Sequence, residues 1–195
     1  MKTDPPRERP GEVARRAVFM DRDGTLNVEK HYLHRPEDWE WLPGVPEGLA
    51  RLAAGGYRLV VVSNQSGIAR GYYAAEAVER LHEFVNRALS ARGARIERFL
   101  FCPHGPDEEP PCECRKPSPG MMLRAAREMG LDLAASWMVG DKRVDVEAGL
   151  AAGCRVVGVR TGYGRKELAT PPDGVTVVDD FPAAAQHVLA CDGGA

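Results

Sequence analysis

Two aspartates, Asp21 and Asp23, stand two residues apart directly after a short apolar run, Ala17–Met20. If that run is a buried strand, both carboxylates can turn into the same crevice, because Gly24 permits an immediate bend of the chain. Two carboxylates this close repel each other unless a cation lies between them, so the spacing indicates a divalent metal ion. An acidic turn that caps a helix would have the same pattern, since Asp and Gly are common turn residues.

Three further segments place polar side chains in similar positions. Ser63 follows the apolar run 59–62, and its hydroxyl and the backbone N–H groups of the next turn could hold an anion. Asp141 comes two residues after a third apolar run, 137–139, and Lys116 precedes a proline at the start of a helical pattern. Because the carboxyl ends of parallel strands meet at one edge of a sheet, we expect these side chains to share one crevice.

The elements that must position these residues follow from the hydrophobic pattern. Short apolar runs, typical of buried strands, alternate with amphipathic stretches of helical period. The runs lie at 17–20, 59–62, 96–101, 137–139, 156–159 and 175–178, and the helical patterns at 45–52, 78–89, 121–129, 144–152 and 182–189. This alternation predicts an α/β fold, a doubly wound, Rossmann-like parallel sheet with helices on both faces.

Length and composition predict a single domain. The chain has 195 residues, of which 44% are hydrophobic, enough for one core. Residues 1–15 carry three prolines and mixed charges without periodicity, so we expect a disordered N-terminal tail. We expect one domain over 16–190 and a C-terminal tail at 191–195, which means that any lid over the crevice is a loop.

The charge balance excludes some functions. With 26 Lys and Arg against 28 Asp and Glu, the net charge of −2 disfavours a protein that holds nucleic acid by charge. No apolar run approaches the ~20 residues of a membrane helix, and the N-terminus lacks the apolar segment of a signal peptide. We therefore expect a cytoplasmic monomer with neither nucleic acid nor membrane as partner.

Three of the five cysteines cluster with a histidine, as the pairs Cys102-x-His104 and Cys112-x-Cys114. Four soft ligands in two tight pairs fit a closed tetrahedral zinc site, which is structural because no coordination position stays open. The loop 102–114 is rich in proline and poor in apolar residues, so a metal ion would have to order it. A disulfide or free thiols are the alternatives; a reducing compartment and the odd number of cysteines disfavour the disulfide.

Several of these segments also resemble a known family. The stretches DRDGTLN, SNQSGIARG, CPHG, CECRKP and MVGDKRVD are similar to the motifs of the haloacid dehalogenase (HAD) superfamily of phosphotransferases, over residues 17–165. More narrowly, they resemble its branch of D-glycero-D-manno-heptose 1,7-bisphosphate 7-phosphatases, which is close to the histidinol-phosphatase domain. The resemblance implies a capless HAD-type domain with a zinc-bound loop. It also implies a Mg²⁺-dependent phosphatase that removes the C7 phosphate through an aspartyl-phosphate.

The resemblance implies roles for individual residues. Asp21 would be the nucleophile, and Asp23 the general acid that protonates the leaving oxygen and then the base that activates water. Ser63 and Lys116 would neutralise charge on the phosphoryl oxygens, and Arg115 would help to recognise the substrate. Magnesium would be held by Asp21, Asp141 and the backbone carbonyl of Asp23. The expected substrate-binding residues are Glu29, Lys30, His31, Tyr32, Asn64, Gln65, Ser66 and Lys142.

Three other functions are compatible with these residues. A histidinol-phosphate phosphatase would share every catalytic residue and differ only in what the loops hold. A DNA-end phosphatase has the same fold but needs a basic stripe, which this sequence does not show. A non-catalytic interaction module stabilised by zinc would have no need of the full set Asp21, Asp23, Lys116 and Asp141.

Overall fold

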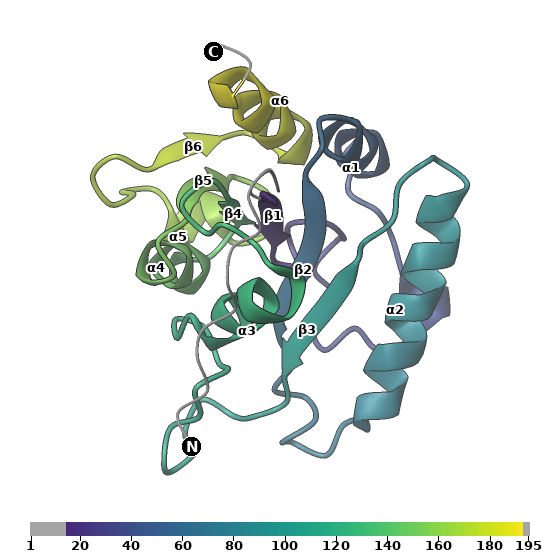
Figure 1. The fold of residues 1–195 in the computed structure, drawn as a ribbon. Helices are drawn as coiled ribbons and strands as arrows, with labels where there is room; N and C mark the ends of the chain where they lie inside the picture. Colours follow the sequence, from purple (N-terminus) through teal and green to yellow (C-terminus); the bar gives the residue numbers. More distant parts are fainter. Residues whose placement is uncertain (1–14, 193–195) are drawn as a thin grey trace, which may run out of the picture.

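Residues 15–192 are the part of the chain that the computed structural model describes. They form a six-stranded parallel sheet with the strand order β3-β2-β1-β4-β5-β6 (Figure 1). The strands are β1 (Ala17–Met20), β2 (Arg58–Asn64), β3 (Arg98–Cys102), β4 (Trp137–Gly140), β5 (Arg155–Val159) and β6 (Thr176–Val178). All six strands predicted from the apolar runs are present, so the α/β prediction is confirmed.

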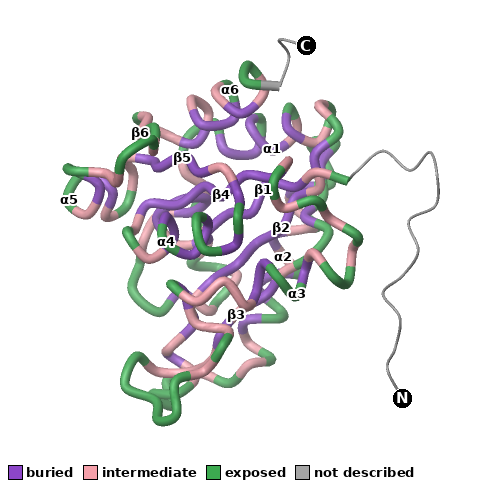
Figure 2. Tube along the Cα trace, turned by 60° about the vertical axis from the view of Figure 1, so that its left-hand side comes forward, coloured by how far each residue is buried: buried purple, intermediate pink, exposed green. Residues whose placement is uncertain are grey.

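Helices cover both faces of the sheet. They are α1 (Val45–Ala54), α2 (Ala75–Ser90), α3 (Gly120–Met129), α4 (Arg143–Ala151), α5 (Gly164–Glu167) and α6 (Phe181–Asp192), with a 3₁₀ helix, η1, at Pro36–Asp38. Apolar residues of α1, α2 and α6 form one core with the sheet, and those of α3 and α4 form a second core. The inner strands β1, β2, β4 and β5 are almost wholly buried between the two cores, whereas the edge strands β3 and β6 are partly exposed (Figure 2). No helix among residues 15–192 has both the length and the apolarity to cross a membrane.

The boundaries differ from the prediction where side chains take over backbone hydrogen bonds. The run at 96–101 predicts a strand from Ile96, but β3 begins at Arg98. The Asn86 side chain of α2 donates to the Ile96 carbonyl and accepts from the Ile96 N–H, both at 2.9 Å, and so replaces a neighbouring strand. The short elements η1 and α5 are not predicted, because three or four residues are too few to show a period.

The N-terminal tail expected over 1–15 lies outside the described residues except for Arg15. That residue pairs with the chain beside α3, where it forms a β-bridge with Leu131. Its carbonyl also accepts a hydrogen bond from the Asp132 N–H at 3.0 Å. The described part of the chain therefore begins one residue before the expected boundary of the domain.

The first two residues of the C-terminal tail expected at 191–195 belong to a helix. Helix α6 continues through Cys191 to Asp192, because its alanine-rich sequence contains no helix breaker before Gly193. Residues 193–195 lie outside the described part of the chain.

The topology fixes where a ligand can bind. The chain leaves β1 towards β2 on one side, and it leaves β4 towards β5 on the other side. In a doubly wound sheet, such a reversal opens a crevice beyond the carboxyl ends of the two central strands. At the end of β1 the chain turns at Gly24, whose φ of +86° lies in the left-handed region that favours glycine. The residues after β1 and β4 therefore face the same crevice.

His82 of α2 provides a test of the packing against β3. Its ring is stacked on Phe99 with centroids 4.3 Å apart, and burial lowers its pKa from 6.5 to about 3. Below about pH 6.5 the unfolded chain therefore binds a proton that the folded chain does not, and the free energy of unfolding falls. We expect wild type to lose about 1 kcal/mol more than His82→Phe between about pH 7.5 and pH 5.5, measured by urea unfolding. Equal losses in the two proteins would contradict this account of His82.

Candidate active site

Three buried carboxylates meet at the carboxyl end of the central strands. Asp21 follows β1, Asp141 follows β4, and Asp145 lies in the first turn of α4. One oxygen of each lies within 4.8 Å of the others. The backbone N–H of Asp21 donates to the Val139 carbonyl at 3.0 Å, which continues the β1–β4 pairing to the site itself. The sheet therefore brings together acids that are far apart in the sequence.

Lys116 supplies the counter-charge for two of these acids. Its buried Nζ lies 2.8 Å from Asp21 Oδ1 and 2.6 Å from Asp145 Oδ1, and it donates to the Val62 carbonyl at 2.7 Å. Burial works to raise the pKa of Asp21, but the charges of Lys116 and Lys142 outweigh it and hold that pKa below its usual value. Asp21 is therefore ionised at neutral pH, the state that a nucleophilic carboxylate needs.

Among residues 15–192, no cation forms an ion pair with Asp141. Burial and the charges of Asp21 and Asp145 raise its pKa to about 8. Its Oδ2 accepts from the Tyr163 N–H at 2.8 Å, and the backbone of Gly24 passes so close that a Cβ there would meet the same oxygen at 2.5 Å. A cluster with more buried negative than positive charge favours a cation, and oxygen donors of this kind fit Mg²⁺. Asp21, Asp141 and Asp145 are the side chains that could hold it.

Asp23 belongs to a separate hydrogen-bond network. Its carboxylate accepts bonds from Arg22, Asn27 and Gln65. The Gln65 amide, 3.1 Å from Asp23 Oδ2, also donates to Ser63 Oγ at 2.8 Å. The Gln65 amide therefore joins Asp23 and Ser63 in the same crevice, but the Asp23 side chain is not part of the carboxylate cluster.

A cavity of about 770 Å³ opens above these groups. Its size falls within the range of sites for small ligands, ~300–1,000 Å³. The predicted residues that line it are Asp21, Asp23, Glu29, His31, Tyr32, Ser63, Asn64, Gln65, Ser66, Arg115, Lys116 and Lys142. The prediction missed others on the same wall, among them Tyr73, Glu108, Tyr163 and Glu167. These residues come from loops and helix ends whose paths the apolar pattern does not define.

Lys30 is the predicted binding residue that does not line this cavity. Its ammonium group pairs with Glu40 at 3.0 Å and donates to the Asp38 carbonyl at 2.9 Å, so local contacts turn it away from the crevice. Lys142, in contrast, is half-buried on the cavity wall, 3.4 Å from Glu29 Oε2. Burial works to lower the pKa of Lys142, but Asp21 and other nearby acids outweigh it and raise that pKa. Lys142 therefore presents a permanent positive charge.

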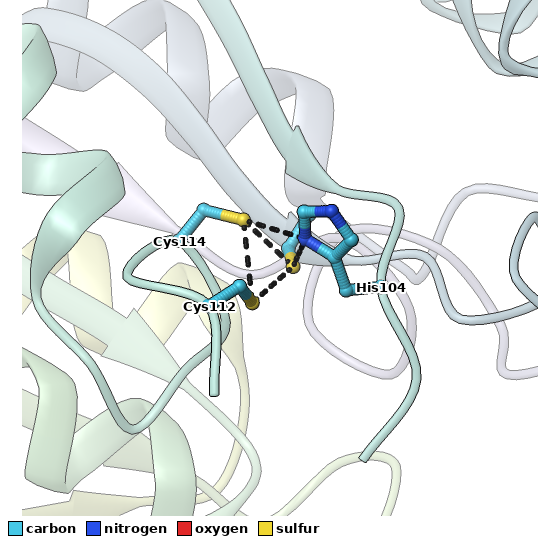
Figure 3. Close-up of side chains that lie close together, drawn as sticks. His104, Cys112 and Cys114 are labelled. Atoms are coloured by element: carbon cyan, nitrogen blue, oxygen red, sulfur yellow. Dashed lines mark hydrogen bonds between the residues drawn. The ribbon is translucent and has the colours of Figure 1, made fainter. Parts of the chain in front are cut away.

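The four predicted zinc ligands lie together, and Cys112 also lines the cavity. Figure 3 shows His104, Cys112 and Cys114 of this cluster. The Cys114 sulfur lies 2.9 Å from the sulfur of Cys102 and 3.6 Å from that of Cys112. His104 turns its Nδ1 towards the sulfurs, 3.3 Å from Cys114. No pair of these sulfurs is bonded as a disulfide, which needs about 2.05 Å. Three thiols and an imidazole around one point are a tetrahedral donor set that fits Zn²⁺.

Comparison with known proteins shows the family. A model described as HAD-hydrolase-like matches residues 113–184. The D-glycero-β-D-manno-heptose-1,7-bisphosphate 7-phosphatase of Pseudomonas aeruginosa is 38% identical over 179 residues, which are 91% of this chain and 99% of that protein. The protein of the same name from Yersinia pestis is 46% identical over 153 residues, 75% of this chain and 81% of that protein. This chain belongs to the heptose-bisphosphate phosphatase family of HAD-like hydrolases.

A solved structure of the same family agrees. The crystal structure of D,D-heptose 1,7-bisphosphate phosphatase from B. bronchiseptica, complexed with magnesium and phosphate, matches this heptose-bisphosphate phosphatase family member with a TM-score of 0.83 at 38% identity. The match covers 90% of this chain and 98% of that chain. The capless HAD-type fold and the family resemblance that the motifs indicate are both confirmed.

In this member of the heptose-bisphosphate phosphatase family, the Cys/His loop is tied to the cavity by hydrogen bonds. Arg115, directly after the last cysteine, donates to the His104 carbonyl at 3.0 Å. The Asn64 side chain donates to the Lys116 carbonyl and accepts from the Lys116 N–H, both at 3.0 Å. The loop thereby holds the Arg115 side chain, and Asn64 at the end of β2 fixes the backbone of Lys116.

The variant Asp141→Asn tests two properties of the carboxylate cluster, its effect on stability without metal and its binding of Mg²⁺. In EDTA at neutral pH we expect the variant to be more stable than wild type by at least about 1 kcal/mol. Because the pKa of Asp141 is raised to about 8, folding at about pH 7 makes this carboxyl take up a proton that the unfolded chain does not hold, and the amide removes that cost. Mg²⁺ at about 100 times its Kd should add about 2.7 kcal/mol to wild type and nothing to the variant, measured by thermal unfolding.

The exposed Asp173→Asn variant is the matched control, and we expect it to respond to Mg²⁺ as wild type does. Equal stabilisation of Asp141→Asn and wild type by Mg²⁺ would place the ion elsewhere.

Proposed function

We propose that this chain is a Mg²⁺-dependent phosphatase that removes the C7 phosphate from D-glycero-β-D-manno-heptose 1,7-bisphosphate through an aspartyl-phosphate. The observation that carries the proposal is the buried, ionised Asp21 against Lys116, at the floor of a cavity with cations on its walls. Relatives that share most of their length with this chain carry that name, which supports the substrate and its anomer.

The contacts of Asp21 support its role as nucleophile. Lys116 occupies Asp21 Oδ1, which leaves Oδ2 to attack phosphorus. As the new P–O bond forms, the bond from phosphorus to the sugar O7 breaks, and Asp23 gives a proton to O7. Asp23 then takes a proton from the water that hydrolyses the aspartyl-phosphate. Ser63 and Lys116 neutralise charge on the transferred oxygens.

Bound Mg²⁺ supplies further charge neutralisation at the phosphoryl oxygens. We propose that the side chains of Asp21 and Asp141 and the backbone carbonyl of Asp23 hold it, with Asp145 close enough to contribute. In this arrangement the four negative charges of a bisphosphate face Lys116, Lys142 and Arg115. Arg115 suits the phosphate that is retained, whereas Lys142 is close enough to Asp21 to lower its pKa and suits the phosphate that is transferred.

A second candidate function rests on two carboxylates of the cavity wall. Glu29 and Glu108 line the cavity, and carboxylates there suit a substrate with an ammonium group. Histidinol phosphate carries such a group, so a histidinol-phosphate phosphatase would use the same catalytic residues and would bind the rest of its substrate through other residues of the cavity. Because Glu29 is already paired with Lys142, we favour the bisphosphate.

Further properties belong to the same proposal. We propose that loop 102–114 binds a structural zinc ion, that residues 16–190 work as one phosphatase domain, and that the protein acts as a cytoplasmic monomer without nucleic acid or membrane partners. The free thiols of the Cys/His cluster support a reducing compartment. The near-neutral charge supports a small-molecule substrate over nucleic acid.

Phosphate release in the presence of Mg²⁺ tests the proposed substrate. We expect the β-anomer of heptose 1,7-bisphosphate to exceed the α-anomer and histidinol phosphate in kcat/KM by about 100-fold or more. The names of the relatives specify the β-anomer, and histidinol phosphate lacks the second phosphate that the cations of the cavity would bind. Preference for histidinol phosphate would contradict the sugar bisphosphate as substrate but not the proposed mechanism. Absence of phosphate release from all three compounds would contradict the substrate and the mechanism.

Elemental analysis and kinetics together test the zinc loop. We expect about one zinc ion per chain in protein purified without chelator, and its loss in Cys112→Ser. Because the loop fixes Arg115, this variant should raise KM about 10-fold or more with a smaller change in kcat. The control Cys191→Ser changes an exposed cysteine of α6 and should keep both zinc and KM. Full zinc in Cys112→Ser, or an unchanged KM without zinc, would contradict the role of the loop.

A further inference from the structure

Arg22, between the two aspartates of the first motif, is one of the largest fully buried side chains of the structure, with 0% of its surface exposed. Burying a guanidinium group is costly unless it is paired and hydrogen-bonded. Its position in the sequence shows only that it separates two acids, and nothing in the apolar pattern predicts that it points into the protein. The role of Arg22 therefore has to be inferred from its contacts in the structure.

The contacts of Arg22 converge on one carboxylate. Its Nη2 lies 2.8 Å from Asp23 Oδ2, and its Nε donates to Asp23 Oδ1 at 3.2 Å, in a side-on bidentate pair. The same Nη2 donates to the Leu33 carbonyl at 2.8 Å, and this contact anchors the guanidinium plane. Among the described residues, Asp23 is the acid with which Arg22 forms an ion pair. A bidentate pair fixes orientation as well as distance.

The pair leaves the two oxygens of Asp23 unequal. Oδ1 accepts from the Nε and Nη2 of Arg22 and from the Asn27 amide at 3.0 Å, so its lone pairs are occupied. Oδ2 accepts from Arg22 and, at 3.1 Å, from the Gln65 amide, which also reaches Ser63. Only the weaker Gln65 contact has to yield for Oδ2 to carry a proton. Oδ2 is thus the oxygen that lies towards the phosphoryl site.

We propose that Arg22 is a positioning residue, which fixes the Asp23 carboxylate so that Oδ2 transfers the proton to the leaving oxygen. The inference rests on the proposed role of Asp23 as general acid. In the first step the P–O bond to the leaving group breaks while the bond from Asp21 to phosphorus forms, and the proton moves from Asp23 Oδ2 to the leaving oxygen. A misplaced Oδ2 would leave that oxygen to depart as an anion.

Two aryl phosphates of similar shape test this directly. 4-Nitrophenolate is a good leaving group that needs little protonation, whereas phenolate needs it far more. We expect Arg22→Met to raise the ratio of kcat/KM for 4-nitrophenyl phosphate over phenyl phosphate by about 10-fold or more. Asp23→Asn should raise the same ratio, and the double variant should add less than about threefold to the effect of Asp23→Asn alone.

Each result decides between the inference and its alternatives. If Arg22→Met lowers kcat/KM for both substrates by the same factor, Arg22 has only a structural role and the inference is wrong. If Asp23→Asn itself leaves the ratio unchanged, the proposed acid role of Asp23 fails, and the inference fails with it. A raised ratio in Asp23→Asn but not in Arg22→Met overturns the inference alone.

Removing a buried charge can also prevent folding, which thermal unfolding and circular dichroism would reveal. Arg22→Lys keeps the charge but can bind only as a point donor, so it loses the bidentate geometry. We expect it to raise the ratio in the same direction by a smaller factor. If neither variant folds, Arg22 is required for the fold itself and the positioning role is overturned.

Discussion

The buried contact of Lys116 with Asp21 and Asp145 is the interaction on which the rest of the site depends. One ammonium group lies 2.8 Å and 2.6 Å from two almost fully buried carboxylates at the floor of the cavity. Such a cluster is stable only if each charge is held in place, since breaking one partner of a buried pair costs about 3–5 kcal/mol. Lys116 keeps Asp21 ionised, and the unbalanced Asp141 favours the cation that the proposed reaction needs.

Three parts of the fold hold this contact from different directions. The sheet brings Asp21 and Asp141 together, because β1 and β4 are adjacent where the topology reverses. Asn64 at the end of β2 fixes the backbone of Lys116 through two hydrogen bonds. The Cys/His loop holds Arg115, the residue before Lys116. Burial of apolar side chains alone could not order this loop. Within residues 15–192 the site is thus built from strand ends, the first turn of α4 and one loop.

The sequence predicts the parts that the sheet controls and misses those that loops control. Asp21, Ser63 and Asp141 are predictable because apolar runs define strands, and parallel strands end at one edge. The place of Lys30 away from the cavity wall could not be predicted, because its contacts with Asp38 and Glu40 depend on the path of the loop between them. The burial of Arg22, the entry of Asp145 into the acid cluster and the Tyr73 side of the cavity likewise need three-dimensional information that spacing does not contain.

Covalent phosphorylation of Asp21 is the event that the proposed mechanism requires, and rapid-quench mass spectrometry of the peptide that contains it measures this event directly. During turnover of the bisphosphate, we predict that this peptide gains the mass of one phosphoryl group on Asp21, and that Asp21→Asn shows neither the modification nor phosphate release. Continued phosphate release with Asp21 unmodified, or a phosphoryl group on another residue such as Ser63, would contradict the account.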